Sequence, residues 1–302
     1  MLITILLKQI AVMALLMALG FFLDRRGFIS EKTVRDLGGI LLKVVIPCVI
    51  VRSCLVAYSG QRLLQLLQSA LLAVIAMTIA MLVSWFVFGK RHRIENFSSA
   101  FSNAGFIGIP LAQAVIGEDG AFFIAALIAM VNFFQWTYGV YVITDDRNSM
   151  APKVVLKNPV VISIVVGVLL FVLRVPIPAI VTSALTQIGN MNTPVAMILM
   201  GTYLAKLPWK QLLDKRAYLC VLFRLIVIPL LTLLAFRLIP INNEEVKIAV
   251  FLAAITPVGA NVCIFANQYN SDYKLSVVTV CLSTILSIAT IPLMFSLAQH
   301  IM

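Results

Sequence analysis

Two short stretches place amides, glycines and prolines in the middle of long apolar runs. The first is SNAGFIGIPLAQAVIG, residues 102–117, and the second is ITPVGANV, residues 255–262. Proline removes a backbone hydrogen-bond donor and glycine disfavours helix, so we expect both stretches to unwind. The amides of Asn103 and Asn261, with the freed backbone N–H and C=O groups, could then bind a polar solute. This is the chemistry of binding, without the groups needed to break a bond.

The charged residues favour an anion as that solute. All twelve acidic residues lie in predicted loops or at helix ends, whereas four basic residues enter predicted spans, namely Lys8, Lys43, Arg52 and Arg224. N-termini of half-helices attract anions, while unwound carbonyl groups suit cations. An arginine can hold a carboxylate through two parallel hydrogen bonds, so Arg52 joins the candidates.

The candidate substrate-binding residues follow from these two arguments. They are Asn103, Gly105, Gly108, Pro110, Thr256, Pro257, Gly259 and Asn261 from the interrupted stretches, together with Asn132 and Arg52. The two histidines, His92 and His300, form no metal pair, and neither a Ser-His-Asp set nor a phosphate-binding loop motif is present. We therefore expect no catalytic residues, no metal site and no cofactor.

Composition predicts an all-α membrane protein. The chain has 302 residues, of which 62% are hydrophobic and only 12% charged. A soluble globule of this composition could not bury all of its apolar surface. Six uncharged runs are long enough to cross about 30 Å of hydrocarbon: 63–88, 96–117, 120–144, 175–205, 248–271 and 275–299. Four further segments, 2–23, 31–58, 158–173 and 217–239, bring the predicted transmembrane helices to ten. We expect the first to be a retained span rather than a cleaved signal peptide, because no basic residue precedes Lys8.

The basic residues predict the orientation of these ten helices. Lysine and arginine concentrate in the odd-numbered loops, whereas the even-numbered loops hold only Arg62, Arg174, Arg237 and Lys247. Because basic loops stay in the cytoplasm, both termini are expected on the external side of a multi-pass protein of the cell membrane. The net charge of +11 then reflects topology, and we expect no nucleic-acid partner.

The chain also reads as two similar halves. A shift of 147 residues brings Pro47 of the second predicted helix onto Pro194 of the seventh, and the two interrupted stretches fall in the fourth and ninth helices. The halves are residues 1–144 and 159–302, joined by a cytoplasmic linker at 145–158. Since each half has five helices, the two repeats must cross the membrane in opposite orientations.

Three segments resemble the auxin efflux carrier family, which includes the plant PIN-type carriers and bacterial carriers linked to organic acids such as malonate or malate. NAGFIGIPL in the fourth helix resembles that family's Asn-x4-Gly-Ile-Pro-Leu pattern. AAITPVGANVCIFANQYN in the ninth resembles its proline-containing segment, and VVIPCVIVRS is similar to its second helix.

The resemblance implies ten helices in two inverted repeats, with the fourth and ninth crossing at the prolines matched by Pro110 and Pro257. It implies a scaffold of helices 1, 2, 6 and 7, a moving transport domain of helices 3–5 and 8–10, and a homodimer. It also implies that Asn103 contacts a substrate carboxylate. Asn132 stands where plant carriers have a glutamine four residues before a tryptophan, matched here by Trp136.

The sequence leaves several alternatives open. The third helix lacks the ionisable pair that plant carriers place near its start, which argues against auxin as the substrate. We expect a transporter of a small mono- or dicarboxylate by alternating access, either facilitative or coupled to H⁺ or Na⁺. A sodium-coupled symporter of the bile-acid-carrier type and a membrane receptor that does not transport are the competing interpretations. The particular acid and the direction of transport are not determined.

Overall fold

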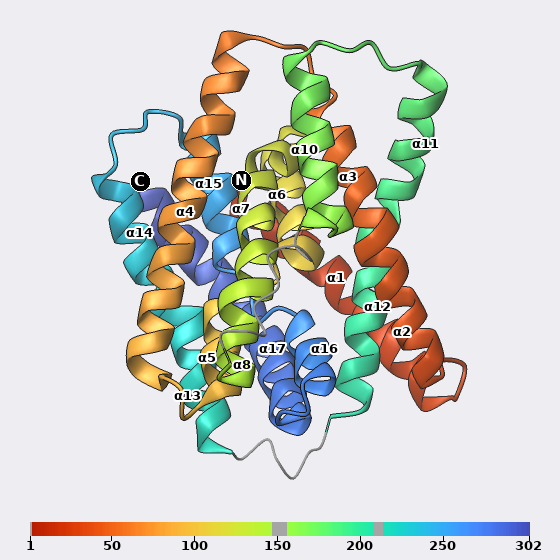
Figure 1. Cartoon of the computed structure of the whole chain (residues 1–302), viewed down its shortest axis with the longest axis vertical. Helices are drawn as coiled ribbons and strands as arrows, with labels where there is room; N and C mark the ends of the chain where they lie inside the picture. Colours follow the sequence, from red (N-terminus) through yellow and green to blue (C-terminus); the bar gives the residue numbers. More distant parts are fainter. Residues whose placement is uncertain (1, 147–155, 208–213) are drawn as a thin grey trace.

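The computed structural model describes residues 2–146, 156–207 and 214–302, and these residues are helical apart from turns and one isolated β-bridge (Figure 1). Six helical segments are long and apolar enough to cross a membrane: Leu2–Arg25, Glu31–Cys54, Gly60–Phe88, Asp119–Thr144, Lys215–Leu238 and Tyr273–Ile301. Large apolar side chains point outward, including Leu15, Phe86 and Ile180, as expected of a surface that faces lipid. The predicted all-α membrane class is therefore confirmed.

Three of the six long segments are single helices: α1 (Leu2–Arg25), α4 (Gly60–Phe88) and α17 (Tyr273–Ile301). The other three contain a π-helical turn: α2, η1 and α3 (Glu31–Ile40, Leu41–Val45, Ile46–Cys54), α7, η3 and α8 (Asp119–Phe134, Gln135–Gly139, Val140–Thr144), and α13, η6 and α14 (Lys215–Leu222, Phe223–Val227, Ile228–Leu238).

The other four predicted spans consist of shorter helices. They are α5 with η2 and α6 (Arg93–Ala100, Ala104–Gly108, Ile109–Ile116), α10 (Pro159–Val172), α11 with α12 (Ala179–Asn190, Asn192–Ala205), and α15 with α16 (Glu244–Ala254, Asn261–Gln268). The ten-helix arrangement in two inverted repeats stays a prediction. Most of the predicted linker, residues 147–155, lies outside the described residues.

Three of the π-helical turns end two residues before a proline, namely Pro47, Pro110 and Pro229. The residue just before each proline donates its N–H five residues back, as Ile109 does to the carbonyl of Ala104. A proline ring collides with the carbonyl four residues earlier, and widening the turn by one residue relieves that collision. These prolines therefore reshape their helices without ending them.

The two predicted interruptions meet in the interior. Helix α5 ends at Ala100 and α15 ends at Ala254, and the extended residues that follow pair through an antiparallel bridge between Ser102 and Val258. The Asn103 N–H donates to the Pro257 carbonyl at 2.9 Å, and the Gly259 N–H donates to the Phe101 carbonyl at 3.0 Å. Backbone groups freed by one break are thus satisfied by the other.

The position of the first break corrects the prediction in detail. The chain leaves the helix at Phe101–Asn103, whereas Gly105 and Gly108 lie in η2 and Pro110 lies in the first turn of α6. Pro110 therefore follows the crossing instead of forming it. In the second stretch, Thr256, Pro257 and Gly259 do lie in the break, and Asn261 begins α16.

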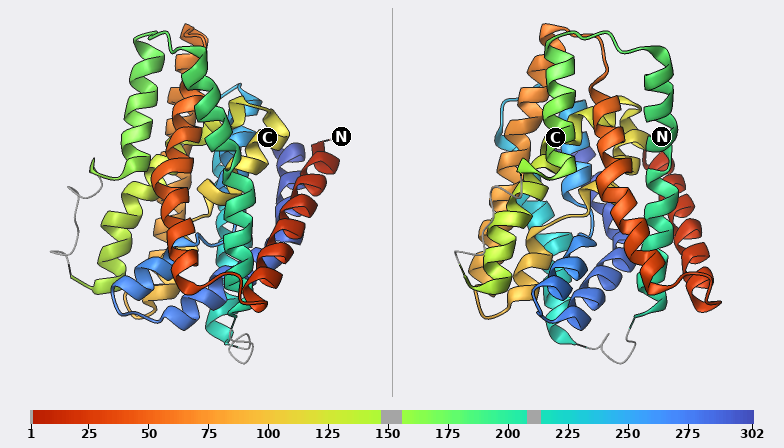
Figure 2. Two further views of the ribbon diagram at one scale, coloured as in Figure 1. Left: turned by 90° about the vertical axis from the view of Figure 1, so that its right-hand side faces the viewer. Right: turned by 45° about the vertical axis from the view of Figure 1, so that its right-hand side comes forward.

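Helices α1 and α12 lie side by side in both views of Figure 2 and approach closely through Gly20 and Gly201. A Cβ atom on Gly20 would lie 2.1 Å from the carbonyl oxygen of Ile198, and one on Gly201 would lie 2.1 Å from that of Met17. Small residues at such crossings let two helix backbones pack without a side chain between them.

We expect Gly20→Ala to destabilise the protein, because the added methyl group overlaps backbone atoms of α12 and overpacking costs about 1–3 kcal/mol. Gly39→Ala is the matched control, since a Cβ there meets nothing within 4 Å and alanine is the better helix former. Thermal unfolding of the detergent-purified variants should give a lower Tm for Gly20→Ala only. Equal melting temperatures would contradict the close contact.

Candidate functional site

A small cavity of about 30 Å³ lies where the two breaks meet. Its walls include residues 102–106 from the first break and the start of η2, and residues 259–261 from the second break and the start of α16. Both half-helices therefore present their N-terminal ends to the same space. The first N–H groups of a helix have no partner within it and carry the positive end of its dipole, so this arrangement suits a negatively charged group.

Asn103 is the N-cap residue of η2, yet its side chain does not cap the helix. The residue is 5% exposed, and its Nδ2 is buried without a hydrogen-bond partner. An amide left unpaired in the interior costs about 1–3 kcal/mol, which a bound acceptor would recover. Asn103 thus offers two N–H donors at the wall of the cavity.

Three further amides connect the elements around the cavity. Asn261 of α16 donates its Nδ2 to Oε1 of Gln135 at 3.1 Å, which ties the second half-helix to η3. Asn132, on α7 and also at the cavity wall, donates its Nδ2 to the Ile128 carbonyl at 2.9 Å. Asn192 at the start of α12 donates to the Gly105 carbonyl at 3.3 Å, and its own Oδ1 is buried without a partner.

Five of the ten candidate residues line the cavity: Asn103, Gly105, Asn132, Gly259 and Asn261. The described lining residues include no carboxylate. The other candidates do not line it. Pro257 accepts the hydrogen bond from Asn103, Thr256 bonds back to the Ala253 carbonyl at 2.8 Å, Gly108 packs against Ala253, and Pro110 is buried at the start of α6.

Arg52 also lies apart from the cavity. Its Nε donates to Thr186 of α11 at 2.7 Å, and its Nη1 pairs with the carboxylate of Glu118 in the turn between α6 and α7. Because Glu118 is exposed, this ion pair contributes little stability. Through Arg52, α3 contacts both α11 and the turn that follows α6, at the end of the first interrupted segment.

Ser102, Gln135 and Asn192 are polar groups at or beside the cavity that the candidate set omitted. Gln135 could have been found from its spacing, because it follows Asn132 by three residues and so shares its helix face. Ser102 could also have been found, because it precedes Asn103 in the first interrupted stretch, whereas Asn192 carries no such signal. The position of Asn192 depends on how segments distant in the sequence pack together.

A second cavity of about 250 Å³ adjoins the first and shares Leu42, Asn132, Val160 and Asn261 with it. Its other lining residues include two bases, Lys43 of η1 and Lys157 just before α10. Both lysines are exposed. We call this space the basic vestibule, since an anion approaching the small cavity through it would pass two positive charges.

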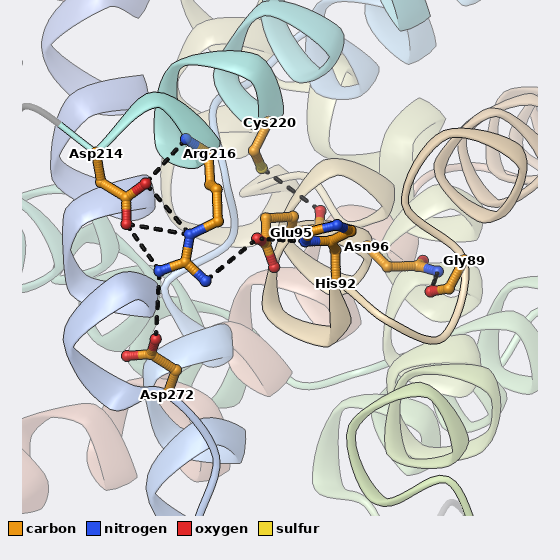
Figure 3. Close-up of polar contacts among 8 residues, drawn as sticks. All are labelled: Gly89, His92, Glu95, Asn96, Asp214, Arg216, Cys220 and Asp272. Carbon is orange, nitrogen blue, oxygen red and sulfur yellow. Dashed lines mark hydrogen bonds and ion pairs between the residues drawn. The ribbon is translucent and has the colours of Figure 1, made fainter.

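An ion cluster joins three helix ends elsewhere in the bundle (Figure 3). Arg216 of α13 pairs with Asp214 at 2.8 Å and lies 3.9 Å from Glu95 of α5 and 4.0 Å from Asp272 before α17. The hydrogen bond from Arg216 lowers the pKa of the Asp214 carboxyl below its usual value. These contacts tie the start of α5, which leads into the first break, to the starts of α13 and α17.

The structure is an all-helical membrane bundle with interrupted helices around a polar cavity, and comparison with known proteins gives its class as a membrane transport protein. A family model described as "Membrane transport protein" matches residues 5–154 and 147–295. The chain therefore belongs to this family, the auxin efflux carriers.

Two relatives are informative. A "Putative malonate transporter" of Rhizobium meliloti (strain 1021) is 26% identical over 208 residues, which cover 66% of this chain and 64% of the relative. The "Uncharacterized transporter YfdV" of Escherichia coli (strain K12) is 24% identical over 297 residues, which cover 92% of this chain and 93% of the relative.

Proposed function

We propose that this protein carries a small organic acid anion, a mono- or dicarboxylate such as malonate or malate, across the cell membrane by alternating access. One observation carries the proposal: two helix N-termini and the unpaired amide of Asn103 face one buried cavity whose described walls hold no carboxylate. Such a site offers hydrogen-bond donors and positive partial charge to a ligand at its centre. The name of the malonate relative supports the substrate class.

The contact between the breaks also supports a ten-helix arrangement. We propose two inverted five-helix repeats, residues 1–144 and 159–302, whose fourth and ninth helices are α5–η2–α6 and α15–α16. Helices α1, α2–α3, α10 and α11–α12 form the scaffold, which is consistent with the packing of α1 on α12 and of α3 on α10 and α11. The remaining helices form the transport domain, and two chains associate as a homodimer.

The small cavity, with about 30 Å³ open to the centre of a water molecule, has room for about two waters and is too small for a dicarboxylate. Sliding of the transport domain against the scaffold would widen it, because Leu42, Ile46 and Val160 of the scaffold close one side. In the orientation predicted from the basic loops, both termini face outward. The basic vestibule beside Lys157 then opens toward the cytoplasm. Glu118 and Arg52 lie at the opposite, external end.

Uptake of radiolabelled malonate, malate and related acids into proteoliposomes tests this function. We expect saturable, protein-dependent flux for at least one carboxylate, inhibited by unlabelled substrate and absent for a neutral analogue such as the diamide. The same acids should raise the Tm of the purified protein. Stabilisation without flux would indicate a receptor, and neither stabilisation nor flux for any carboxylate would reject an organic-anion site.

Neutralising the basic vestibule should weaken capture of the anion from that side. We expect Lys43→Gln with Lys157→Gln to raise KM about 3- to 10-fold at low ionic strength with kcat little changed, because the lysines attract the anion without touching it in the small cavity. The difference should shrink in high salt, which screens exposed charges. Lys32→Gln together with Lys274→Gln, which removes two lysines that do not line the vestibule, is the control, and an equal effect there would contradict a local role.

A further inference from the structure

Arg224 is a charged side chain placed in the interior of the bundle, where it is 2% exposed. Every hydrogen bond that its guanidinium group makes goes to a backbone carbonyl. Nε donates to Thr256 at 3.1 Å, Nη1 donates to Ser99 at 3.2 Å and Ala100 at 3.5 Å, and Nη2 donates to Ala254. Its acceptors therefore supply partial negative charge, with no carboxylate among them.

These four carbonyls belong to the two broken segments. Ser99 and Ala100 end α5, Ala254 ends α15, and Thr256 lies in the second break. The last carbonyls of a helix lack partners within it and form the negative end of its dipole. Arg224 therefore binds the C-terminal ends of the half-helices that precede the two breaks, whereas the N-terminal ends of the half-helices that follow the breaks line the cavity.

Backbone carbonyls that converge at unwound helices commonly coordinate an alkali cation in transporters. In this chain the guanidinium group fills that position, from a π-helical turn that leads into Pro229. A side chain cannot leave with the substrate, so the positive charge stays with the protein in every conformation. Arg224 acts through the backbone of the crossing and is a positioning residue.

We propose that Arg224 is a tethered substitute for a coupling cation, so that anion transport by this protein does not require sodium. The inference rests on the proposed transport function, but it concerns the carbonyl cluster around Arg224 rather than the cavity beside Asn103. It also excludes sodium coupling from the modes that the sequence left open, since a sodium-coupled carrier would need those carbonyls for its ion, and it leaves facilitative and H⁺-coupled transport.

The first experiment exchanges the cation around the unaltered protein. Initial rates of radiolabelled malonate uptake and the Tm of the purified protein are measured in NaCl, KCl and N-methylglucamine chloride at equal ionic strength. We expect the same rate and the same Tm in all three salts. A rate or a Tm that rises specifically with Na⁺ would overturn the proposal.

The second experiment removes the guanidinium group and returns its charge in soluble form. We expect Arg224→Ala to lower Tm by roughly 5 °C or more, because four buried carbonyls lose their donors. Millimolar ethylguanidinium, or Na⁺ entering the vacated carbonyl cluster, should recover part of that loss in Arg224→Ala and leave the unaltered protein unchanged. Arg237→Ala, an exposed arginine on the same predicted span, is the matched control and should show neither effect.

A conservative variant keeps the test decisive if the alanine variant cannot be purified. Arg224→Lys retains a buried positive charge and should stay sodium-independent with reduced flux, whereas Arg224→Gln should lose most of the flux. Unchanged Tm and flux in Arg224→Gln would overturn the proposal. If no carboxylate is transported, the transport function fails, yet the response of Arg224→Ala to cations still decides whether this cluster is a cation site.

Discussion

Replacing Asn103 by alanine is expected to lower kcat/KM for organic acid uptake by about 100-fold. A hydrogen bond to a charged group contributes about 1.5–3 kcal/mol, and each 1.4 kcal/mol corresponds to a factor of ten. The Asn103 amide is buried and unpaired, so its donors have no other function in the described structure. Asn103→Asp should be worse, because a carboxylate would replace the donors with a charge that repels the substrate.

The measurement is radiolabelled uptake at several substrate concentrations, with Tm recorded for each variant to show that it is folded. Asn267→Ala is the matched control, since Asn267 is an exposed amide on α16 that does not line the cavity. We expect the control to transport normally and Asn103→Ala to lose both flux and stabilisation by substrate. Normal uptake by a folded Asn103→Ala protein would remove this cavity as the substrate site.

Replacing Gly105 by leucine is expected to abolish transport while the protein still folds. A Cβ on Gly105 would lie 3.1 Å from Cδ1 of Ile46, and the rest of the side chain would have to enter a cavity of about 30 Å³. The end of the Ile46 side chain can shift, so we expect a folding cost of about 1–3 kcal/mol instead of collapse. A filled cavity leaves no room for the anion and obstructs sliding of η2 past Ile46 of α3.

Graded substitutions separate blockage of the site from general damage. Gly105→Ala should retain part of the flux, because its single methyl group only tightens the contact with Ile46. Gly39→Leu adds the same side chain where a Cβ meets nothing within 4 Å, and it should transport normally. Substrate should stabilise Gly39→Leu and fail to stabilise Gly105→Leu. Full flux in Gly105→Leu would show that the substrate passes elsewhere.

The sequence alone determined the class of the protein and the two segments in which helices break, although it placed the first break several residues too late. Apolar runs longer than a bilayer is thick leave few alternatives to membrane helices, and glycine and proline weaken a helix locally whatever surrounds it. Both break regions and the absence of deep carboxylates among the lining residues were therefore predictable. Four candidate residues, Asn103, Gly105, Gly259 and Asn261, line the cavity for this reason, since residues around a break cannot be far from it.

Only the tertiary structure decided which of these residues face one another and what the buried arginines do. The sequence suggested Arg52 as an anion contact, yet Arg52 pairs with Glu118. Arg224 instead donates hydrogen bonds to backbone carbonyls at both breaks. Asn192 reaches Gly105 across 87 residues of sequence, and Asn261 reaches Gln135 across 126. Such contacts depend on how helices pack, because a side chain's partners are set by the relative position of segments that the local pattern does not fix.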